Sequence, residues 1–169
     1  ALGGSGNDTF CSLTLTPSGD LLVLGDSSSV SSGDKSQNSK GENDFWMVKV
    51  DANGSKIWDK TIGGSHNDHK PKVESTNDGN YILAGPARSE ATGDKSEASN
   101  GSQDYWVIKI DENGSKIWDK SIGGPSQDIS TALTITLDNK IIVAGHTPNF
   151  LGGDKTEAGQ GGRDFWIVK

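Results

Sequence analysis

The sequence predicts an all-β fold built from three copies of one 60-residue unit, with no helix. The first observation is a repeat: "DFWMVKVDANGSKIWDKTIGG" at residues 44–64 returns as "DYWVIKIDENGSKIWDKSIGG" at residues 104–124, and its opening returns as "DFWIVK" at residues 164–169. The second is local, because short runs rich in aromatic and β-branched residues alternate with tight-turn sequences. A fixed period of this length is typical of a repeat architecture.

Each unit is predicted to form four antiparallel strands. Residues 9–16 (TFCSLTLT) alternate apolar and polar side chains, the period of a half-buried strand, and "PSGD" after them is a tight turn. Residues 21–25 are an apolar run that ends in glycine and form the second strand. Residues 45–50 form the third, residues 51–54 (DANG) a hairpin turn in which Asn-Gly accepts a positive φ, and residues 55–62 the fourth.

Four antiparallel strands in a unit of this length are the pattern of a β-propeller-type blade. The predicted units are residues 1–62, 63–122 and 123–169, and the third lacks its last strand. Such a chain closes no ring by itself and leaves strand edges open. We therefore expect a partial ring or a fragment of a larger propeller, completed by other copies or by the rest of a longer chain. A stacked β-array is the alternative.

The tryptophans stand at repeated positions, three on the third strands and two on the fourth, and are assigned to packing between blades. They are Trp46, Trp58, Trp106, Trp118 and Trp166. Trp58 and Trp118 resemble the docking tryptophan of PQQ-type propellers, but the turn before them is one residue shorter, so that cofactor is not expected. Cys11, the only cysteine, is predicted to be a buried small hydrophobe.

Three segments resemble tandem repeats of large secreted and surface proteins of Bacteroidota, which are cargo of type IX secretion. They are "GDKSE", "DENGSKIWDKSIGG" and "NDGNYILAG". The resemblance covers essentially the whole chain and implies an exported protein, extracellular or at the cell surface. It does not specify a function.

Composition and motifs exclude several classes. The formal net charge of −7 argues against a nucleic-acid partner. No apolar run approaches the ~18 residues of a membrane span, so no membrane insertion is expected. The sequence holds no nucleophile elbow, no phosphate-binding glycine loop and no Cys/His nucleophile pair, so the chain is predicted not to be an enzyme.

The predicted binding surface is the set of long connections between second and third strands, residues 26–43, 86–103 and 146–163. Each contains "GDK" and ends just before an aspartate. The candidate binding residues are Asp34, Glu42, Asp44, Asp94, Asp104, Asp154 and Asp164. The oxygens of Asp34 and Asp44 would suit a calcium ion, the only cofactor that the sequence suggests, and turn-stabilising hydrogen bonds are the alternative.

The first strand of the second unit, predicted over residues 69–76, departs from its counterparts. Lys70, Lys72 and Glu74 are expected to face a central channel, where either water or an acidic ligand would meet them. His66 and His69 have no aligned partners in the other units and are a weak zinc signature.

The predicted function is a non-enzymatic module acting in adhesion, protein–protein interaction or extracellular structure, with a protein or a surface glycan as partner. The alternative is a carbohydrate-binding module, or part of a carbohydrate-active enzyme whose catalytic residues lie outside this chain. A building block of an extracellular filament is a third reading.

Overall fold

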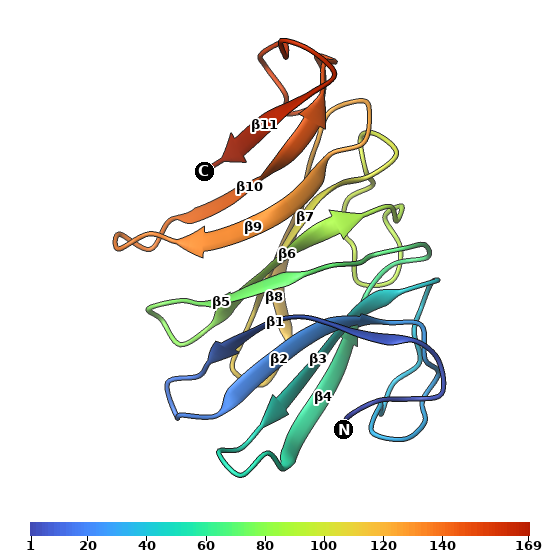
Figure 1. Cartoon of the computed structure of the whole chain (residues 1–169), viewed down its shortest axis with the longest axis vertical. Coiled ribbons are helices and arrows are strands. Elements are labelled where there is room, and N and C mark those ends of the chain that lie inside the picture. The colour runs from blue at the N-terminus through green and yellow to red at the C-terminus, as the bar shows by residue number, and fades with distance from the viewer.

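A computed structural model describes residues 1–169 as eleven β-strands and no helix (Figure 1). The strands are β1 (Asp8–Leu15), β2 (Leu21–Ser27), β3 (Asp44–Val50), β4 (Lys56–Ile62), β5 (Lys72–Ser75), β6 (Tyr81–Ala87), β7 (Asp104–Ile110), β8 (Lys116–Ile122), β9 (Ile129–Ile135), β10 (Ile141–Pro148) and β11 (Arg163–Val168). The chain contains no helix long and apolar enough to span a membrane.

The strands form three antiparallel sheets, each from strands that are consecutive in the chain. The orders are β1-β2-β3-β4, β5-β6-β7-β8 and β9-β10-β11. The sheets follow one another along the long axis of the molecule (Figure 1), and β1 contacts β5, which contacts β9. The all-β prediction is therefore confirmed as three antiparallel sheets of three or four strands. They do not close into a ring.

The hairpin between β3 and β4 shows why its sequence recurs. The carboxylate of Asp51 accepts the backbone N–H groups of Asn53 at 2.9 Å and Ser55 at 2.8 Å. Gly54 has φ +82°, a left-handed conformation that glycine adopts without a side-chain clash. The same two bonds form in the hairpin between β7 and β8.

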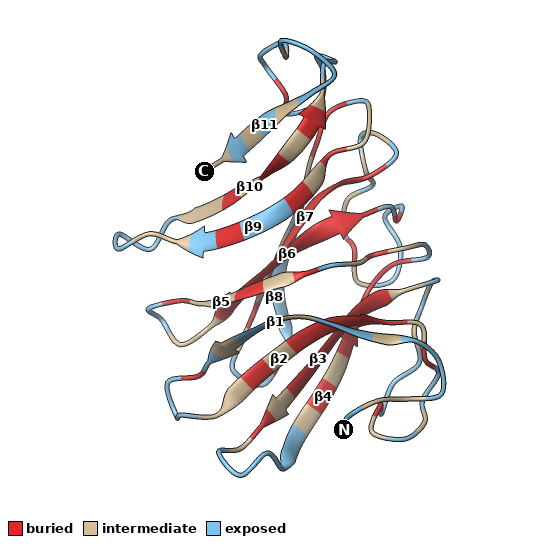
Figure 2. Ribbon diagram, in the orientation of Figure 1, coloured by how far each residue is buried: buried red, intermediate tan, exposed pale blue.

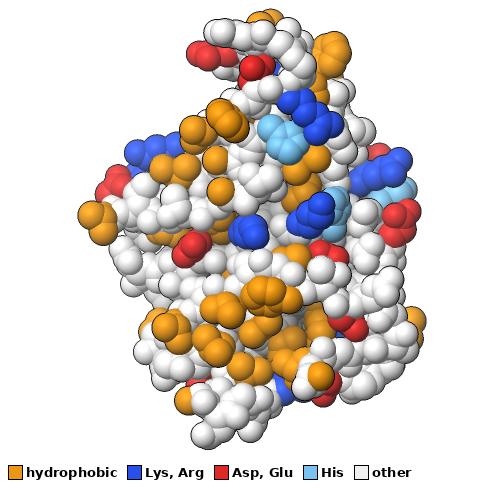
Figure 3. All heavy atoms as spheres, viewed as in Figure 1, with side chains coloured by type: hydrophobic (Ala, Val, Ile, Leu, Met, Phe, Trp, Pro, Cys, Tyr) orange, Lys and Arg blue, Asp and Glu red, His pale blue; other side chains and the backbone are white.

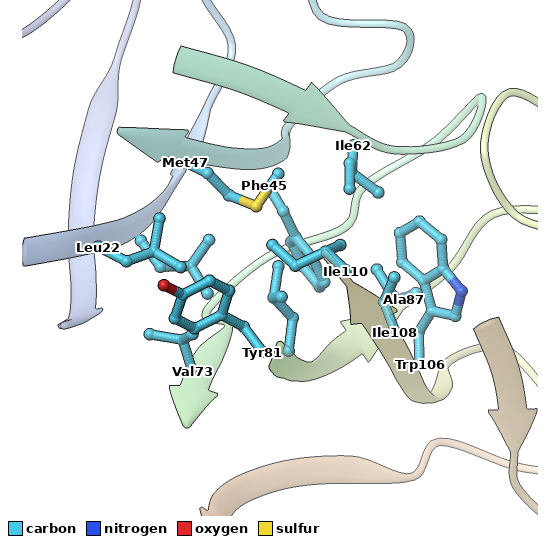
Figure 4. Close-up of a cluster of buried hydrophobic side chains, with 12 residues drawn as sticks. Leu22, Phe45, Met47, Ile62, Val73, Tyr81, Ala87, Trp106, Ile108 and Ile110 are labelled. Carbon is cyan, nitrogen blue, oxygen red and sulfur yellow. The ribbon is translucent and has the colours of Figure 1, made fainter. Parts of the chain in front are cut away.

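Successive side chains of a strand point to opposite faces of its sheet, and in each sheet both faces carry apolar residues. We call the face that carries Trp46, Trp106 or Trp166 the front face, and the opposite one, with Phe45, Tyr105 or Phe165, the back face. The back face of the first sheet packs on the front face of the second around twelve buried residues, which Figure 4 shows as sticks. A smaller cluster joins the back face of the second sheet to the front face of the third.

An aromatic pair stands at each of these two interfaces. The ring centroids of Phe45 and Trp106 are 5.4 Å apart, and those of Tyr105 and Trp166 are 5.1 Å apart, with interplanar angles of 36° and 42°. Tilted pairs at this separation are favourable beyond the area they bury. The interface between sheets is therefore itself a repeated structure, with partners 61 residues apart.

Two apolar faces have no sheet over them. The front face of the first sheet holds Trp46 and its neighbours, with Leu15 63% exposed at its edge. On the back face of the third sheet Phe165 is 94% and Ile167 is 67% exposed. Figure 2 shows that exposed residues are common along β9 and β11 but absent from β6 and β7 of the second sheet, and Figure 3 shows hydrophobic side chains gathered over the first sheet.

Two local predictions are wrong. The inner strand of the second unit covers only Lys72–Ser75 instead of residues 69–76, because Pro71 has no N–H to donate and Lys70 adopts φ +49°. Cys11 is half-buried beside β2 and not a core hydrophobe. Its Sγ lies 3.3 Å from Oδ1 of Asp26, and burial together with this carboxylate raises the pKa of the thiol to about 12.

Candidate functional site

The long connections β2–β3, β6–β7 and β10–β11 lie against the segments that enter each sheet. Asp34 makes this contact in the first of them. Its Oδ2 accepts the N–H of Gly3 at 3.1 Å, while its own N–H donates to the carbonyl of Gly3 at 2.8 Å. The same two bonds recur at 3.0 and 2.9 Å between Asp94 and Gly63, and at 3.1 and 2.9 Å between Asp154 and Gly123. We call this pair of bonds the aspartate clasp.

The clasp explains the glycine before each of these aspartates. Gly33 has φ +55°, and a Cβ there would lie 2.5 Å from the carbonyl oxygen of Gly3. Any other residue would push the two segments apart. The "GD" pair is therefore explained by backbone geometry.

The lysine after each of these aspartates is buried, although lysine is rarely found inside proteins. Lys35 is 2% exposed, and its Nζ donates to the carbonyl of Gln37 at 2.6 Å and to the Ser39 hydroxyl at 3.4 Å. Lys95 and Lys155 are 3% and 6% exposed. Burial lowers the pKa of Lys35 and Lys95, and the carboxylates around each lysine oppose that shift. These side chains hold the loops in place from inside.

The aspartates at the loop exits of the first two sheets are also buried. Asp44 accepts the N–H groups of Lys40 and, at 3.4 Å, of Gly41, and its Oδ1 has no hydrogen-bond partner. Burial, with a smaller contribution from the charge of Asp68, outweighs these hydrogen bonds and raises the pKa of Asp44 to about 6.

Asp104 repeats this arrangement in the second sheet. It accepts the N–H of Asn100 at 2.5 Å, its Oδ1 is unpartnered, and burial raises its pKa to about 6. Asp164 in the third sheet accepts the N–H of Gln160 at 2.8 Å. All three carboxylates therefore turn the loop back into the strand that follows.

The predicted binding residues are thus placed in three different surroundings. Asp34, Asp94 and Asp154 are in clasps, and the exit aspartates cap their own loops. Glu42 is exposed on the loop surface. No three His, Cys, Asp or Glu side chains gather closely enough to hold a metal ion, Asp34 and Asp44 included. Calcium binding by these loops stays a prediction.

The tryptophans of β3 and β7 donate a hydrogen bond from the indole to an aspartate of the next strand. Trp106 is fully buried, and its Nε1 donates to Asp119 at 2.9 Å, as Trp46 does to Asp59 at 3.2 Å. The carboxylate of Asp119 is buried. Hydrogen bonds from a lysine, a backbone N–H and the Trp106 indole nevertheless outweigh the effect of burial and lower the pKa of Asp119.

Trp58 and Trp118 differ from each other although their sequences match. Trp58 packs against the core and against Gly114, where an added Cβ would lie 3.0 Å from the indole ring. Trp118 is 37% exposed at the edge of a hollow that Val107 and Val168 also line. The expectation that Trp118 is buried between sheets is therefore wrong, because residues 1–169 contain no third hairpin to cover it.

One repeated set of residues escaped the sequence reasoning. Asp8, Asp68 and Asp128 each accept the N–H of the second glycine of a Gly-Gly pair at 2.7 Å. Their period of 60 was a signal that could have found them. They lie beside the clasps and complete the contact between each entering segment and its long loop.

The chain is similar in sequence to part of a larger protein. No protein-family model matches the chain. A protein named regulatory protein FlaEY, from Caulobacter vibrioides, is 26% identical over 157 residues, which cover 88% of this chain. The chain spans only 16% of that protein's length.

Proposed function

We propose that the chain is a non-enzymatic repeat module of the β-propeller type that acts by pairing its sheets with further sheets of the same kind. Four-stranded meanders with their inner strands side by side support the blade interpretation. The carboxylates that recur in every unit are engaged in structural hydrogen bonds, which supports a binding or structural role over catalysis. Location outside the cell or at the bacterial surface rests on the sequence resemblance.

The observation that carries the proposal is the complementarity of the two uncovered faces. At both internal interfaces a back face meets a front face and places Phe45 on Trp106 or Tyr105 on Trp166. The uncovered faces are one front face and one back face. A second copy would therefore place its Phe165 on Trp46 and repeat the same contact a third time. The pairing is head to tail, because the two surfaces differ.

The experiment measures self-association by sedimentation velocity between about 2 and 200 µM protein. Phe165→Asp places a charge on the apolar back face of the third sheet. Leu15→Asp does the same on the front face of the first sheet. Leu137→Asp is the matched control, since Leu137 is fully exposed in the β9–β10 turn and lies on neither face. We expect the wild type and the control to associate with rising concentration and each face variant to remain monomeric.

Mixing the two face variants identifies the mode of pairing. Each keeps one intact face, so an equimolar mixture should form dimers and nothing larger. A wild type that stays monomeric over the whole range would refute the proposal for this chain. Association that survives both substitutions would place the contact elsewhere.

A further inference from the structure

Two adjoining hollows open where β1, β5 and β9 lie side by side. Their volumes are about 600 and 540 Å³, and both have Lys70 and Ile129 in their walls. Lys72 and Arg163 line the first hollow and Arg88 lines the second. Figure 3 shows Lys, Arg and His side chains across the middle of this face. Four cations thus meet in one region of a chain whose net charge is −7.

These cations do not belong to the repeat. Ten of the sixteen Lys and Arg residues recur at intervals of 60, namely Lys35, Lys95, Lys155, Lys49, Lys109, Lys169, Lys56, Lys116, Lys60 and Lys120. The other six are Lys40, Lys70, Lys72, Arg88, Lys140 and Arg163. Four of these six line the hollows. Because eight of the ten recurring lysines make hydrogen bonds or ion pairs within the fold, an asymmetric set of this kind favours a separate task.

Ion pairing is absent from the cations of the hollows. The six ion pairs of the structure use Lys40, Lys49, Lys56, Lys109, Lys116 and Lys120. None of the four cations of the hollows is in an ion pair. Asp26 lies near Lys70, but its carboxylate accepts the backbone N–H at 2.9 Å and not the ammonium group. The positive charge of the hollows is therefore left for a ligand.

The backbone is strained at the same place. Apart from Asn139 in a tight turn, Lys70 is the only non-glycine residue with a positive φ, at 49°. Such conformations cost free energy and gather at functional sites. Here it delays the start of β5 and sets the Lys70 side chain at the wall shared by both hollows.

A line of uncharged hydrogen-bonding groups extends from Arg163 to His69. Arg163 donates to Gln127 at 2.9 Å, Gln127 to Gln103 at 3.1 Å, and Gln103 lies 2.6 Å from Nε2 of His69. Arg163 also lies 3.1 Å from Nε2 of His146. These contacts hold the guanidinium group in place without neutralising it.

We infer that the hollows bind an acidic oligosaccharide, with uronic-acid carboxylates on Arg163 and the lysines and sugar hydroxyls on the amides between them. Arginine receives a carboxylate through two parallel hydrogen bonds. The hollows are of the size that holds ligands in proteins, and several cations spread along them fit a chain with repeated carboxylates better than one small anion. The site lies within one chain, so it does not depend on pairing of the end faces.

The test is calorimetric titration of the whole chain with a uronic-acid tetrasaccharide at about 50 mM salt, where charge contacts are weakly screened. The neutral tetrasaccharide of the same linkage, tetraglutamate and inorganic sulfate are the comparison ligands. The double variant Arg163→Gln, Lys72→Gln should weaken binding of the acidic sugar by about tenfold or more. Lys140→Gln, a one-off cation in the β9–β10 turn, should leave it unchanged. Arg88→Gln is a second, independent variant, and thermal melting shows that each is folded.

The acidic sugar should bind more tightly than all three comparison ligands. Equal binding of the neutral sugar would overturn the role of charge, and equal binding of sulfate would mean a simple anion site. Tighter binding of tetraglutamate would point to an acidic peptide instead. No binding, or the same loss with Lys140→Gln, would also refute the inference.

Discussion

The packing between sheets gives a sharp prediction, because the repeat supplies its own control. Phe45 and Phe165 stand at the same position of their units, but Phe45 is fully buried against Trp106 while Phe165 is 94% exposed. Phe45→Ala removes a ring from the twelve-residue core between the first and second sheets. Phe165→Ala deletes the equivalent ring where it is already exposed to solvent.

The magnitude follows from what each ring touches. Burial of a phenylalanine contributes about 1.5–3 kcal/mol, and the cavity left by truncation brings the cost of Phe→Ala in a core to about 3–5 kcal/mol. The aromatic pair adds about 0.5–1.5 kcal/mol for Phe45 alone. Substitution of the exposed ring should change the free energy of unfolding by less than about 0.5 kcal/mol.

Urea unfolding, followed by tryptophan fluorescence, measures both changes. The protein concentration should be low enough for the chain to be monomeric. We expect the midpoint to fall steeply for Phe45→Ala, with an unchanged slope, and to stay in place for Phe165→Ala. Equal effects of the two substitutions would show that the first and second sheets do not pack as described.

Three further predictions concern the tryptophans, the buried aspartates and calcium. Trp58→Ala should lower the free energy of unfolding by about 2–4 kcal/mol and Trp118→Ala by about 1 kcal/mol, since only Trp58 is covered by a neighbouring hairpin; chemical unfolding compares them. Burial raises the pKa of Asp44 and Asp104 to about 6, so between the unfolded and folded pKa values the folded chain binds protons that the unfolded chain does not. Stability should therefore decrease as pH rises from about 4 to about 7, and Asp44→Asn with Asp104→Asn should flatten this dependence in thermal melts; a drop of the same size in the double variant would contradict the assignment. If calcium orders the long loops, EDTA should lower the melting temperature and calcium should restore it, whereas an unchanged melt would exclude that role.

The strands could be predicted from sequence where local pattern decides them. Residues 45–50 and the hairpin after them were placed correctly, because alternation and Asn-Gly chemistry act within a few residues. The short β5 depends on one proline and on the left-handed backbone of Lys70, and the pattern of the other units hid both. The bounds of a strand are therefore predicted best where its own residues determine them.

The roles of the candidate site residues were harder to predict from sequence, because they depend on contacts between residues far apart in the chain. Asp34 was singled out by its recurrence as a binding residue, but nothing in the sequence indicated its structural partner Gly3, which lies 31 residues away. Burial of Lys35 could not be foreseen from a charged residue in a polar loop. The exposed ring of Trp118 has the same local sequence as Trp58, so only its surroundings in three dimensions distinguish the two.

The aspartate clasp has a consequence for how such a chain can grow. Each clasp joins the glycine that enters a sheet to an aspartate in the long loop of that sheet, and Gly63, which pairs with Asp94, directly follows the last strand of the sheet before. Every stretch of 60 residues thus carries one glycine half and one aspartate half of the joint, wherever the stretch begins. An in-frame duplication of that length would create a new joint without any new contact having to evolve. The clasp makes the gene able to lengthen or shorten in whole units while the protein stays folded.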